Sequence, residues 1–305
     1  MKLLIIDAHA ILHRAYHALP KEGFKNKGQL INALYGFFSM LLKVISQLKP
    51  DYLLACFDAP GPTFRHQQFI GYQANRPKMA DELSQQINLA RESLQEAQIP
   101  VLLQPGFEAD DLIGTIIKKM KKKKKKEKDW QIIVVTGDKD LMQLVDKQVK
   151  LFLLTKGVSQ AELIGSREVK KRLGVKPEQV VDYKALVGDT SDNYPGVAGI
   201  GPKTAVKLLR QFGSLERILR EREKIAPKLR EKLLAGEKAA RLSYQLAQIV
   251  CQVPLNFKLS SACWSDEKLR RLKKVLRQLG FPSLVRRIER QLEVKKELKE
   301  QMKLI

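Results

Sequence analysis

Short apolar runs that end in acidic residues alternate with amphipathic stretches along the first half of the chain. The apolar runs predict buried strands at residues 3–6, 52–57, 101–103, 132–136 and 149–154. The stretches between them predict helices, most clearly at residues 30–48 and 81–97. Strands that alternate with helices indicate an α/β fold with a central, mostly parallel sheet flanked by helices.

The second half of the chain lacks apolar runs of this kind and has the pattern of short helices broken by glycine and proline. These helices are predicted at residues 167–173, 177–187, 203–212, 215–219, 239–249 and from 266 onward. We therefore expect an α/β core over residues 1–165 and a helical module over residues 166–305.

The charge balance indicates a polyanionic partner. Lys and Arg number 56 against 33 Asp and Glu, which gives a formal net charge of +23 over 305 residues. Such an excess favours nucleic acid or an anionic membrane surface. The three cysteines are scattered and form no CxxC pair, which argues against a disulfide framework and a zinc site. Since no apolar stretch approaches the roughly 18 residues of a membrane span, we expect a soluble, cytoplasmic protein with no membrane partner.

Acidic residues nevertheless gather where the predicted strands end. Asp7 ends the first strand, Asp58 ends the second, and Asp138 and Asp140 follow the strand at residues 132–136. Because the carboxyl ends of parallel strands meet at one edge of a sheet, these acids are expected on one rim.

Two further acidic groups extend this set. Glu108, Asp110 and Asp111 begin an apolar helix, and Asp189 and Asp192 precede a glycine-rich stretch. A helix dipole or an ordinary turn would explain either group taken alone. Nine carboxylates on one rim would repel each other, by about 4 kcal/mol for two charges 4 Å apart at an effective dielectric near 20.

Such a rim needs either protons or cations among its carboxylates. Ligand sets of oxygen alone favour Mg²⁺ or Mn²⁺, and this many carboxylates can hold two ions. Two ions about 4 Å apart suit the in-line attack of water on a phosphodiester. The sequence therefore indicates metal-assisted phosphodiester hydrolysis.

The glycine-rich stretch at residues 196–205 is interpreted separately from the acidic residues. It contains Gly196, Gly199, Gly201, Lys203 and Thr204, and Lys207 follows on the next helix. A Walker loop is excluded because Pro202 disturbs the spacing and no strand precedes the stretch. We interpret it as a hairpin between two helices, at about residues 185–212, whose backbone N–H groups approach a phosphate. A plain helix–helix turn is the alternative.

Together these motifs resemble the 5′-nuclease domain of bacterial DNA polymerase I, within the flap endonuclease family. The resemblance covers nearly the whole chain, from IIDAHAILHRAYHALP through ALYGF, CFDAPGPTFR, GYQANRP, GFEADDLIGT, VVTGDKDLMQLV and LVGDTSDNYPGVAGIGPKTA to LSYQLAQIV and LGFPSLVRRI. It implies a PIN-like nuclease core, a helical arch at about residues 60–95 and a helix–three-turn–helix. It also implies two metal ions and the removal of 5′ flaps, RNA primers or 5′-terminal nucleotides from DNA with a flap, nick or 5′ end.

The resemblance also assigns roles to single residues. Glu108, Asp110, Asp111 and Asp138 would hold the first ion, lined by Asp7 and Asp58, while Asp140, Asp189 and Asp192 would hold the second. In the arch, at residues 64–76, Arg65 and Arg76 would face the scissile phosphate, supported by Lys78, and Tyr72 would stack on a base. The hairpin would bind duplex phosphates, with K⁺ on its backbone carbonyls.

The chain departs from the family pattern at three places. Gln73 stands where the family usually has a basic residue, which removes one positive charge near the reacting phosphate. The lysine run at residues 118–128 is unusually long and is predicted to be a solvated extension or loop. The chain ends where the family often continues into a polymerase, so it is either a stand-alone nuclease or a separated one, and any DNA polymerase would act as a separate partner. We expect a monomer, with a DNA polymerase and a ligase as separate partners.

Three other functions are weighed against this one. A flap-binding protein that has lost catalysis is the main alternative, although none of the nine acids is replaced. A small-substrate phosphohydrolase would need a second Asp two residues after Asp7, where His9 stands. An RNA-cutting nuclease with the same core fits the arch and hairpin less well. We interpret His9, His13 and His17 as incidental, since hard ions do not need imidazole.

Overall fold

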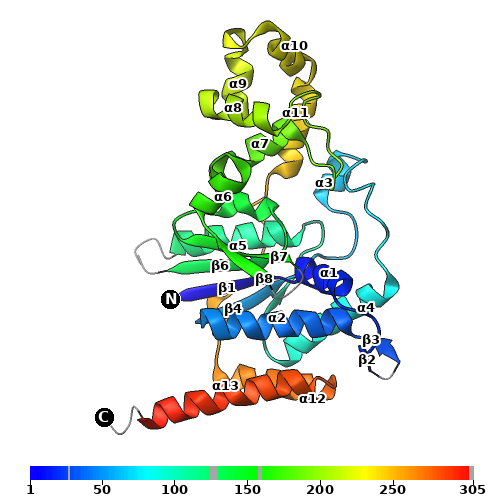
Figure 1. Cartoon of the computed structure of the whole chain (residues 1–305), viewed down its shortest axis with the longest axis vertical. Coiled ribbons are helices and arrows are strands. Elements are labelled where there is room, and N and C mark those ends of the chain that lie inside the picture. The colour runs from blue at the N-terminus through cyan, green and yellow to red at the C-terminus, as the bar shows by residue number, and fades with distance from the viewer. Residues whose placement is uncertain (27, 124–129, 157–159, 302–305) are drawn as a thin grey trace.

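The computed structural model describes residues 1–26, 28–123, 130–156 and 160–301. Its centre is a sheet with the strand order β5-β4-β1-β6-β7-β8 (Figure 1). The strands are β1 (Lys2–Asp7), β4 (Tyr52–Cys56), β5 (Val101–Leu102), β6 (Gln131–Thr136), β7 (Val149–Lys156) and β8 (Gln160–Ile164). All neighbouring pairs are parallel except β7 and β8. This confirms the mostly parallel sheet and adds β8, which the sequence pattern did not indicate. A small antiparallel hairpin pairs β2 (Lys25–Asn26) with β3 (Gln29–Leu30).

Side chains of the central strands alternate between two apolar layers because successive residues of a strand point to opposite faces. In β1, Leu3 and Ile5 pack into one layer, while Leu4 and Ile6 pack into the other. The first layer includes α5 (Ala109–Lys123), and the second includes α1 (Ala8–Ala18), α2 (Asn32–Leu48) and α4 (Asp81–Glu96). Burying each such side chain stabilises the fold by about 1.5–3 kcal/mol.

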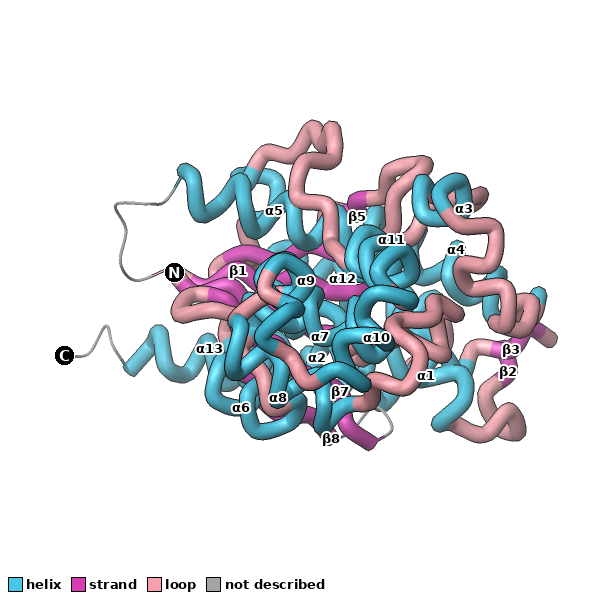
Figure 2. Tube along the Cα trace, turned by 90° about the horizontal axis from the view of Figure 1, so that it is seen from above, coloured by secondary structure: helices cyan, strands magenta, loops and turns pink. Residues whose placement is uncertain are grey.

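The helical module lies above the sheet in Figure 1 and shares the apolar layer of α5. Its helices are α6 (Ser166–Leu173), η2 (Pro177–Gln179), α7 (Val180–Val187), α8 (Pro202–Phe212), α9 (Leu215–Arg220), η3 (Arg222–Lys224), α10 (Pro227–Ala235) and α11 (Glu237–Ala247). The predicted hairpin joins α7 to α8, which pack against each other. Seen from above, α8 to α11 stack over the sheet (Figure 2).

The last helices pack elsewhere. Beyond η4 (Leu259–Ala262), α12 (Asp266–Gln278) contacts α4, and α13 (Pro282–Gln301) contacts α2. Both lie below the sheet in Figure 1, on the opposite side from the helical module. The division at residue 165 therefore remains a prediction for α6 to α11, whereas α12 and α13 join the apolar layer of the α/β core.

Two sequence expectations change in detail. Of the predicted arch at residues 60–95, the part from residue 81 belongs to α4, which packs against α1 and α2, and the short α3 (Phe64–Gln68) lies before it. The first part of the lysine run continues α5 as far as Lys123, because Met120 is buried and Lys121 pairs with Asp146. Residues 124–128 lie outside the described residues.

No helix in the described part of the chain is long and apolar enough to cross a membrane.

Candidate active site

A cleft of about 870 Å³ opens beyond the carboxyl ends of the central strands. Both overall views place α1, α3 and α4 at this end of the sheet, opposite the N-terminus. The predicted acids that line the cleft are Asp7, Asp58, Glu108, Asp110, Asp138, Asp140 and Asp192. Seven of the nine predicted acids therefore line one cavity, and four of them, Asp7, Asp58, Asp138 and Asp140, follow strands as the sequence analysis expected.

Asp7, Asp110 and Asp138 form what we call the first acidic cluster. Asp7 ends β1 and caps α1, where its Oδ1 accepts a hydrogen bond from the backbone N–H of Ala10 at 3.3 Å. Its Oδ2 accepts a hydrogen bond from the Thr136 hydroxyl at 2.5 Å. Asp110 lies in the first turn of α5, and Asp138 follows β6. Three separate elements thus bring these carboxylates together.

The first acidic cluster lacks a cationic partner. Within the described residues, no Lys or Arg forms an ion pair with any of its three members. Burial raises the pKa of Asp7 to about 7, and the charges of Asp58 and Asp138 add to the shift. Burial raises the pKa of Asp110 well above its ordinary value, with Asp138 and Asp7 contributing. The cluster is therefore poorly suited to carry its charge unless a cation joins it.

Asp140, Asp189 and Asp192 form the second acidic cluster. One carboxylate oxygen of each lies within 4.8 Å of the others, an arrangement that could hold a metal ion. Asp140 begins η1 (Asp140–Leu144). Asp189 and Asp192 lie in a tight turn after α7, closed by two backbone hydrogen bonds of 2.9 and 3.0 Å between Asp189 and Tyr194.

The chain supplies its own cations to this second cluster. Lys184, on α7, forms ion pairs with Asp140 and, at 2.7 Å, with Asp189. Arg76 lies 2.6 Å from Asp192. Burial raises the pKa of Asp140 to about 7, because the nearby Asp138 adds to the effect and Lys184 only partly offsets it. Burial also acts on Asp189, but Lys184 and hydrogen bonds outweigh it and lower the pKa to about 2.

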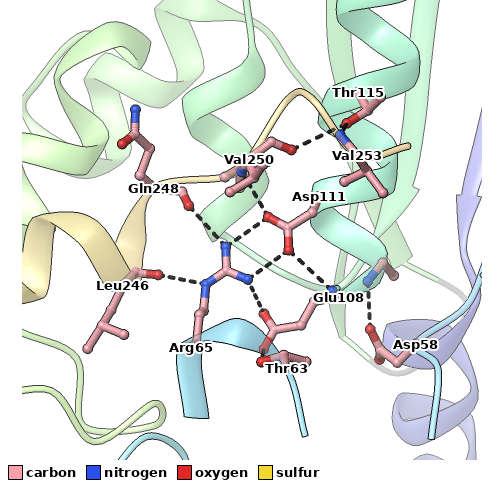
Figure 3. Close-up of polar contacts among 12 residues, drawn as sticks. Asp58, Thr63, Arg65, Glu108, Asp111, Thr115, Leu246, Gln248, Val250 and Val253 are labelled. Carbon is pink, nitrogen blue, oxygen red and sulfur yellow. Dashed lines mark hydrogen bonds and ion pairs between the residues drawn. The ribbon is translucent and has the colours of Figure 1, made fainter. Parts of the chain in front are cut away.

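Asp111 and Arg65 are placed differently from the prediction. Asp111 is fully buried and forms ion-paired hydrogen bonds of 2.8 and 2.9 Å with the Arg65 guanidinium, which is 2% exposed (Figure 3). Arg65 also donates to Glu108 and to the carbonyl oxygens of Leu246 and Gln248. These contacts engage all five guanidinium donors. Arg65 is therefore a buried structural cation with no donor left for a phosphate, and Asp111 is its counter-ion instead of an ion ligand in the cleft.

Glu108 and Asp58 complete the wall of the cleft. Glu108 accepts hydrogen bonds from Arg65 and from the Tyr72 hydroxyl, at 3.0 and 3.2 Å, and burial raises its pKa to about 7. Asp58 accepts a hydrogen bond from the backbone N–H of Ala109 at 2.7 Å, at the start of α5.

His9 is not incidental, contrary to our interpretation of the sequence. Its Nδ1 accepts a hydrogen bond from the backbone N–H of Asp58 at 3.1 Å, and its side chain lines the cleft. His13 and His17 also line the cleft, on the same face of α1. The histidines at spacing four therefore border the site without being needed as ion ligands.

The arch residues are only partly where the sequence predicted them. Arg76 and Lys78 are exposed and line the cleft. Tyr72 also lines the cleft but is 4% exposed, with its ring packed at right angles to His66. A ring so enclosed is not presented for stacking on a base in this structure. Gln73 adopts a left-handed backbone conformation, with φ of 55°, and its side chain donates to Asp192.

The hairpin residues divide into an exposed and a buried set. The exposed residues are Gly199, Gly201, Lys203 and Lys207, and Thr204 is half-buried. Gly196 is buried and donates its N–H to the Ser243 hydroxyl, so it does not reach a phosphate here. Its φ is 63°, and a Cβ atom would lie 2.3 Å from the backbone nitrogen of Gly188. Gly196 thus serves the close packing of the hairpin on α7.

Sequence reasoning missed Lys184 and Thr136. Thr136 is a polar residue at the end of a buried apolar strand, and this is a signal that could have identified it. Lys184 stands five residues before Asp189, but the helix ends between them, so helical spacing does not indicate the contact.

The chain belongs to the 5′-3′ exonuclease family. The family's N-terminal resolvase-like domain matches residues 2–174, and its C-terminal SAM fold matches residues 175–270. DNA polymerase I of Caldicellulosiruptor bescii is 42% identical over 94% of this chain and 33% of its own length. The 5′-3′ exonuclease of Aquifex aeolicus is 36% identical over 94% of this chain and 95% of its own length. The chain thus spans about a third of the length of its DNA polymerase I relatives.

Solved structures share the fold. The bacteriophage T5 D15 flap endonuclease, solved with DNA and metal ions, is 20% identical, with a TM-score of 0.66 over 95% of this chain and all of that protein. The catalytic core of Rad2 with a DNA substrate is 17% identical, with a TM-score of 0.57 over 91% of this chain and 86% of that protein.

Proposed function

We propose that this chain is a structure-specific 5′-3′ exonuclease and 5′-flap endonuclease that hydrolyses DNA phosphodiesters with two divalent metal ions. The observation that carries the proposal is the convergence of seven carboxylates in one cleft. Family membership supports it, because the 5′-3′ exonuclease models match residues 2–270. The DNA in the T5 D15 and Rad2 complexes supports DNA as the substrate.

The residues of the cleft suit Mg²⁺ or Mn²⁺. The donors are carboxylate oxygens from several elements, which these hard ions prefer. The raised pKa values of Asp7, Asp110 and Glu108 indicate a site where ionised carboxylates would be stabilised by a bound cation. The first acidic cluster, with Glu108 and Asp58, would hold one ion, and the second acidic cluster would hold the other. When bound, two such ions supply an activated water and stabilise the leaving oxygen.

The chain's own residues would bind and orient the substrate. Arg76 and Lys78 stand on the cleft wall and would contact the phosphates next to the scissile bond. The exposed side of the hairpin would bind the duplex backbone through N–H groups at the start of α8 and through Lys203 and Lys207. A potassium ion on the hairpin carbonyls would complete this contact. Such contacts do not depend on base sequence, as removal of flaps and primers requires.

We infer that the protein acts in replication and repair in the cytoplasm, as a monomer beside a separate DNA polymerase and ligase. The similarity to DNA polymerase I supports a place next to strand synthesis. Residues 166–247 would then be the DNA-binding module and residues 1–165 the nuclease core.

The test is a cleavage assay on 5′-labelled DNA with a flap, a nick or a single strand, in Mg²⁺, Mn²⁺ or chelator. We expect short 5′ products that require metal, with flaps cut fastest. Asp138→Ala protein should bind the flap and leave it uncut. The proposal fails if cleavage persists in chelator or if the Asp138→Ala protein cuts at the normal rate.

A flap-binding protein without catalysis remains the second candidate, because Gln73 removes a positive charge and donates to Asp192 at 3.1 Å. The same assay separates the two functions. The second candidate requires flap binding without products in either metal, and Gln73→Lys should then create cleavage.

A further inference from the structure

Lys184 stands inside the second acidic cluster. Its Nζ pairs with Oδ1 of Asp140 and with Oδ2 of Asp189, the latter at 2.7 Å, and the side chain is only 13% exposed. An ammonium group in this position neutralises carboxylates that would otherwise repel each other. The chain therefore supplies a cation of its own to this cluster.

The Lys184 ammonium and a metal ion would need the same space. The oxygens of Asp140, Asp189 and Asp192 lie within 4.8 Å of one another, and the lysine nitrogen is within hydrogen-bond distance of two of these residues. Mg²⁺ stands about 2.0–2.1 Å from its ligand oxygens. An ion shared by these carboxylates would therefore come into contact with the nitrogen, and the two cations exclude each other.

We propose that Lys184 is a positioning residue that holds Asp140 and Asp189 in place, and that the second metal ion binds by displacing its ammonium group. The inference rests on the proposed function, because it takes the second acidic cluster as an ion site. It has a consequence for the order of binding. The first acidic cluster has no Lys or Arg ion pair in the part of the chain that the structure describes, so its ion should bind more tightly than the second.

The third carboxylate of the cluster is also engaged by the chain. Oδ1 of Asp192 accepts hydrogen bonds from Arg76 at 2.6 Å and from Gln73 at 3.1 Å. The backbone N–H of Gln73 also donates to the Asp192 carbonyl at 3.0 Å. When Asp192 turns to an ion, Arg76 loses its partner and becomes available to a substrate phosphate. Loading of the second ion would thus prepare the arch for DNA.

A neighbouring hydroxyl can receive the displaced ammonium. Tyr194 is 3% exposed, and its hydroxyl has no hydrogen-bond partner in the described chain. Burial opposes the charge of Lys184, but the carboxylates of Asp140 and Asp189 outweigh it and hold the pKa of the ammonium above its ordinary value. Tyr194 pairs through its backbone with Asp189, an ion-pair partner of Lys184. Its oxygen would therefore offer an acceptor after displacement, which limits the cost of moving a buried charge.

The experiment is a Mn²⁺ titration of the full chain without DNA, with free Mn²⁺ followed by electron paramagnetic resonance. We expect the wild type to bind one tight and one weaker ion. Lys184→Met should tighten the weaker ion by about tenfold or more, since no ammonium has to be displaced. Lys184→Arg, which keeps the cation, should stay near the wild type. Lys139→Met is the matched control, because Lys139 is exposed between Asp138 and Asp140 in sequence and pairs with no carboxylate in the described chain.

The outcomes separate the inference from the function beneath it. If Lys184→Met leaves the weaker affinity unchanged or lowers it, Lys184 does not compete with the ion and the inference is wrong. The inference is also overturned if Lys139→Met tightens the weaker ion as much, since the effect would then be one of net charge alone. If the wild type binds no Mn²⁺, the proposed function itself fails. Thermal unfolding checks that each variant is folded, and Lys184→Gln replaces Lys184→Met if the latter is not.

Discussion

The two acidic clusters border the same cleft but handle their charge in different ways. Asp140 and Asp192 of the second cluster line the cleft, whereas Asp189 does not. The first acidic cluster has no ion pair with Lys or Arg in the described chain, and burial raises the pKa of its members Asp7 and Asp110. The second has Lys184 between two carboxylates and Arg76 on the third. The first can thus be neutralised by protons or metal ions, whereas the second already contains cations. The difference teaches that similar carboxylates in one cavity need not bind ions equally well.

A third arrangement lies just behind the cleft. Asp111 is next to Asp110 in sequence, yet it is buried in an ion pair with Arg65. It also accepts a hydrogen bond from the backbone N–H of Val250 at 2.8 Å. Adjacent residues on a helix point about 100° apart, so one faces the cavity and the other faces the core. Of these two neighbouring acids, one therefore lines the cleft and the other makes buried structural contacts.

The largest expected effect comes from removing a carboxylate of the first acidic cluster. Asp110→Asn should lower the single-turnover rate of flap cleavage by about a thousandfold or more, since an ion ligand is lost. In chelator, the same variant should unfold at a higher temperature, because repulsion with Asp7 and Asp138 is relieved. A variant with normal cleavage and lowered stability would contradict the assignment.

Asp111→Leu should instead destabilise the fold. It leaves the buried Arg65 guanidinium without its main partner, which costs about 3–5 kcal/mol in the free energy of unfolding. Urea denaturation measures this change. The double variant Arg65→Met with Asp111→Leu should recover much of the loss, because neither charge remains. If the single variant is as stable as the wild type, the pair is not the structural element described above.

Asp7 of the first cluster and Asp189 of the second should have opposite effects on the pH dependence of stability in chelator. Burial raises the pKa of Asp7 to about 7 in the folded chain, whereas its pKa in the unfolded chain is near 3.8. The folded state therefore binds more protons in this window, and the free energy of unfolding should fall as the pH rises through it. Asp189, with a pKa lowered to about 2, should instead lose stability as the pH falls from 3.8 toward 2.

Thermal unfolding at several pH values, with Asp7→Asn and Asp189→Asn as separate variants, measures these opposite slopes. Asp7→Asn should make the fall in the upper window shallower without removing it, because burial also raises the pKa values of Asp140 and Glu108 to about 7. Asp189→Asn should flatten the lower window. A wild type whose stability in chelator rises between pH 4 and 7, by an amount that Asp7→Asn removes, would contradict the assigned shift of Asp7.

The smallest effects are expected outside the cleft, at the hairpin. Lys203→Ala and Lys207→Ala should each weaken duplex binding several-fold and lower the salt dependence by about one unit of slope. Fluorescence anisotropy over a range of salt concentrations measures both. Lys274→Ala is the control, because Lys274 is exposed on α12, below the sheet and away from the hairpin. Equal effects from the control would show that net charge alone is responsible.

Much of the fold and the cleft could be predicted because strand ends carry the signal. Asp7, Asp58 and Asp138 follow buried apolar runs, and parallel pairing brings such positions to one rim. The pairing of Arg65 with Asp111 could not be predicted, since it joins residues 46 positions apart through burial. The sequence shows that Arg65 and Asp111 are charged, but only the packing of the folded chain determines whether each side chain contacts water, a phosphate or a counter-ion.

The same limit applies to Lys184, Gly196 and β8. Lys184 reaches Asp140 across 44 positions, which no local period encodes. Gly196 was predicted to approach a phosphate, but the backbone of Gly188 lies so close that Gly196 instead allows the hairpin to pack tightly. The strand β8 is short, and three of its five residues are exposed, so it lacks the apolar run by which the other strands were found.

The most direct measurement is anomalous diffraction from crystals soaked in Mn²⁺ and recorded at the manganese edge. We expect a strong peak among Asp7, Asp110 and Asp138. We also expect a second, weaker peak among Asp140, Asp189 and Asp192, with Lys184 moved away. No peak in the cleft at saturating Mn²⁺ would contradict the central claim that these carboxylates hold the ions that cut DNA.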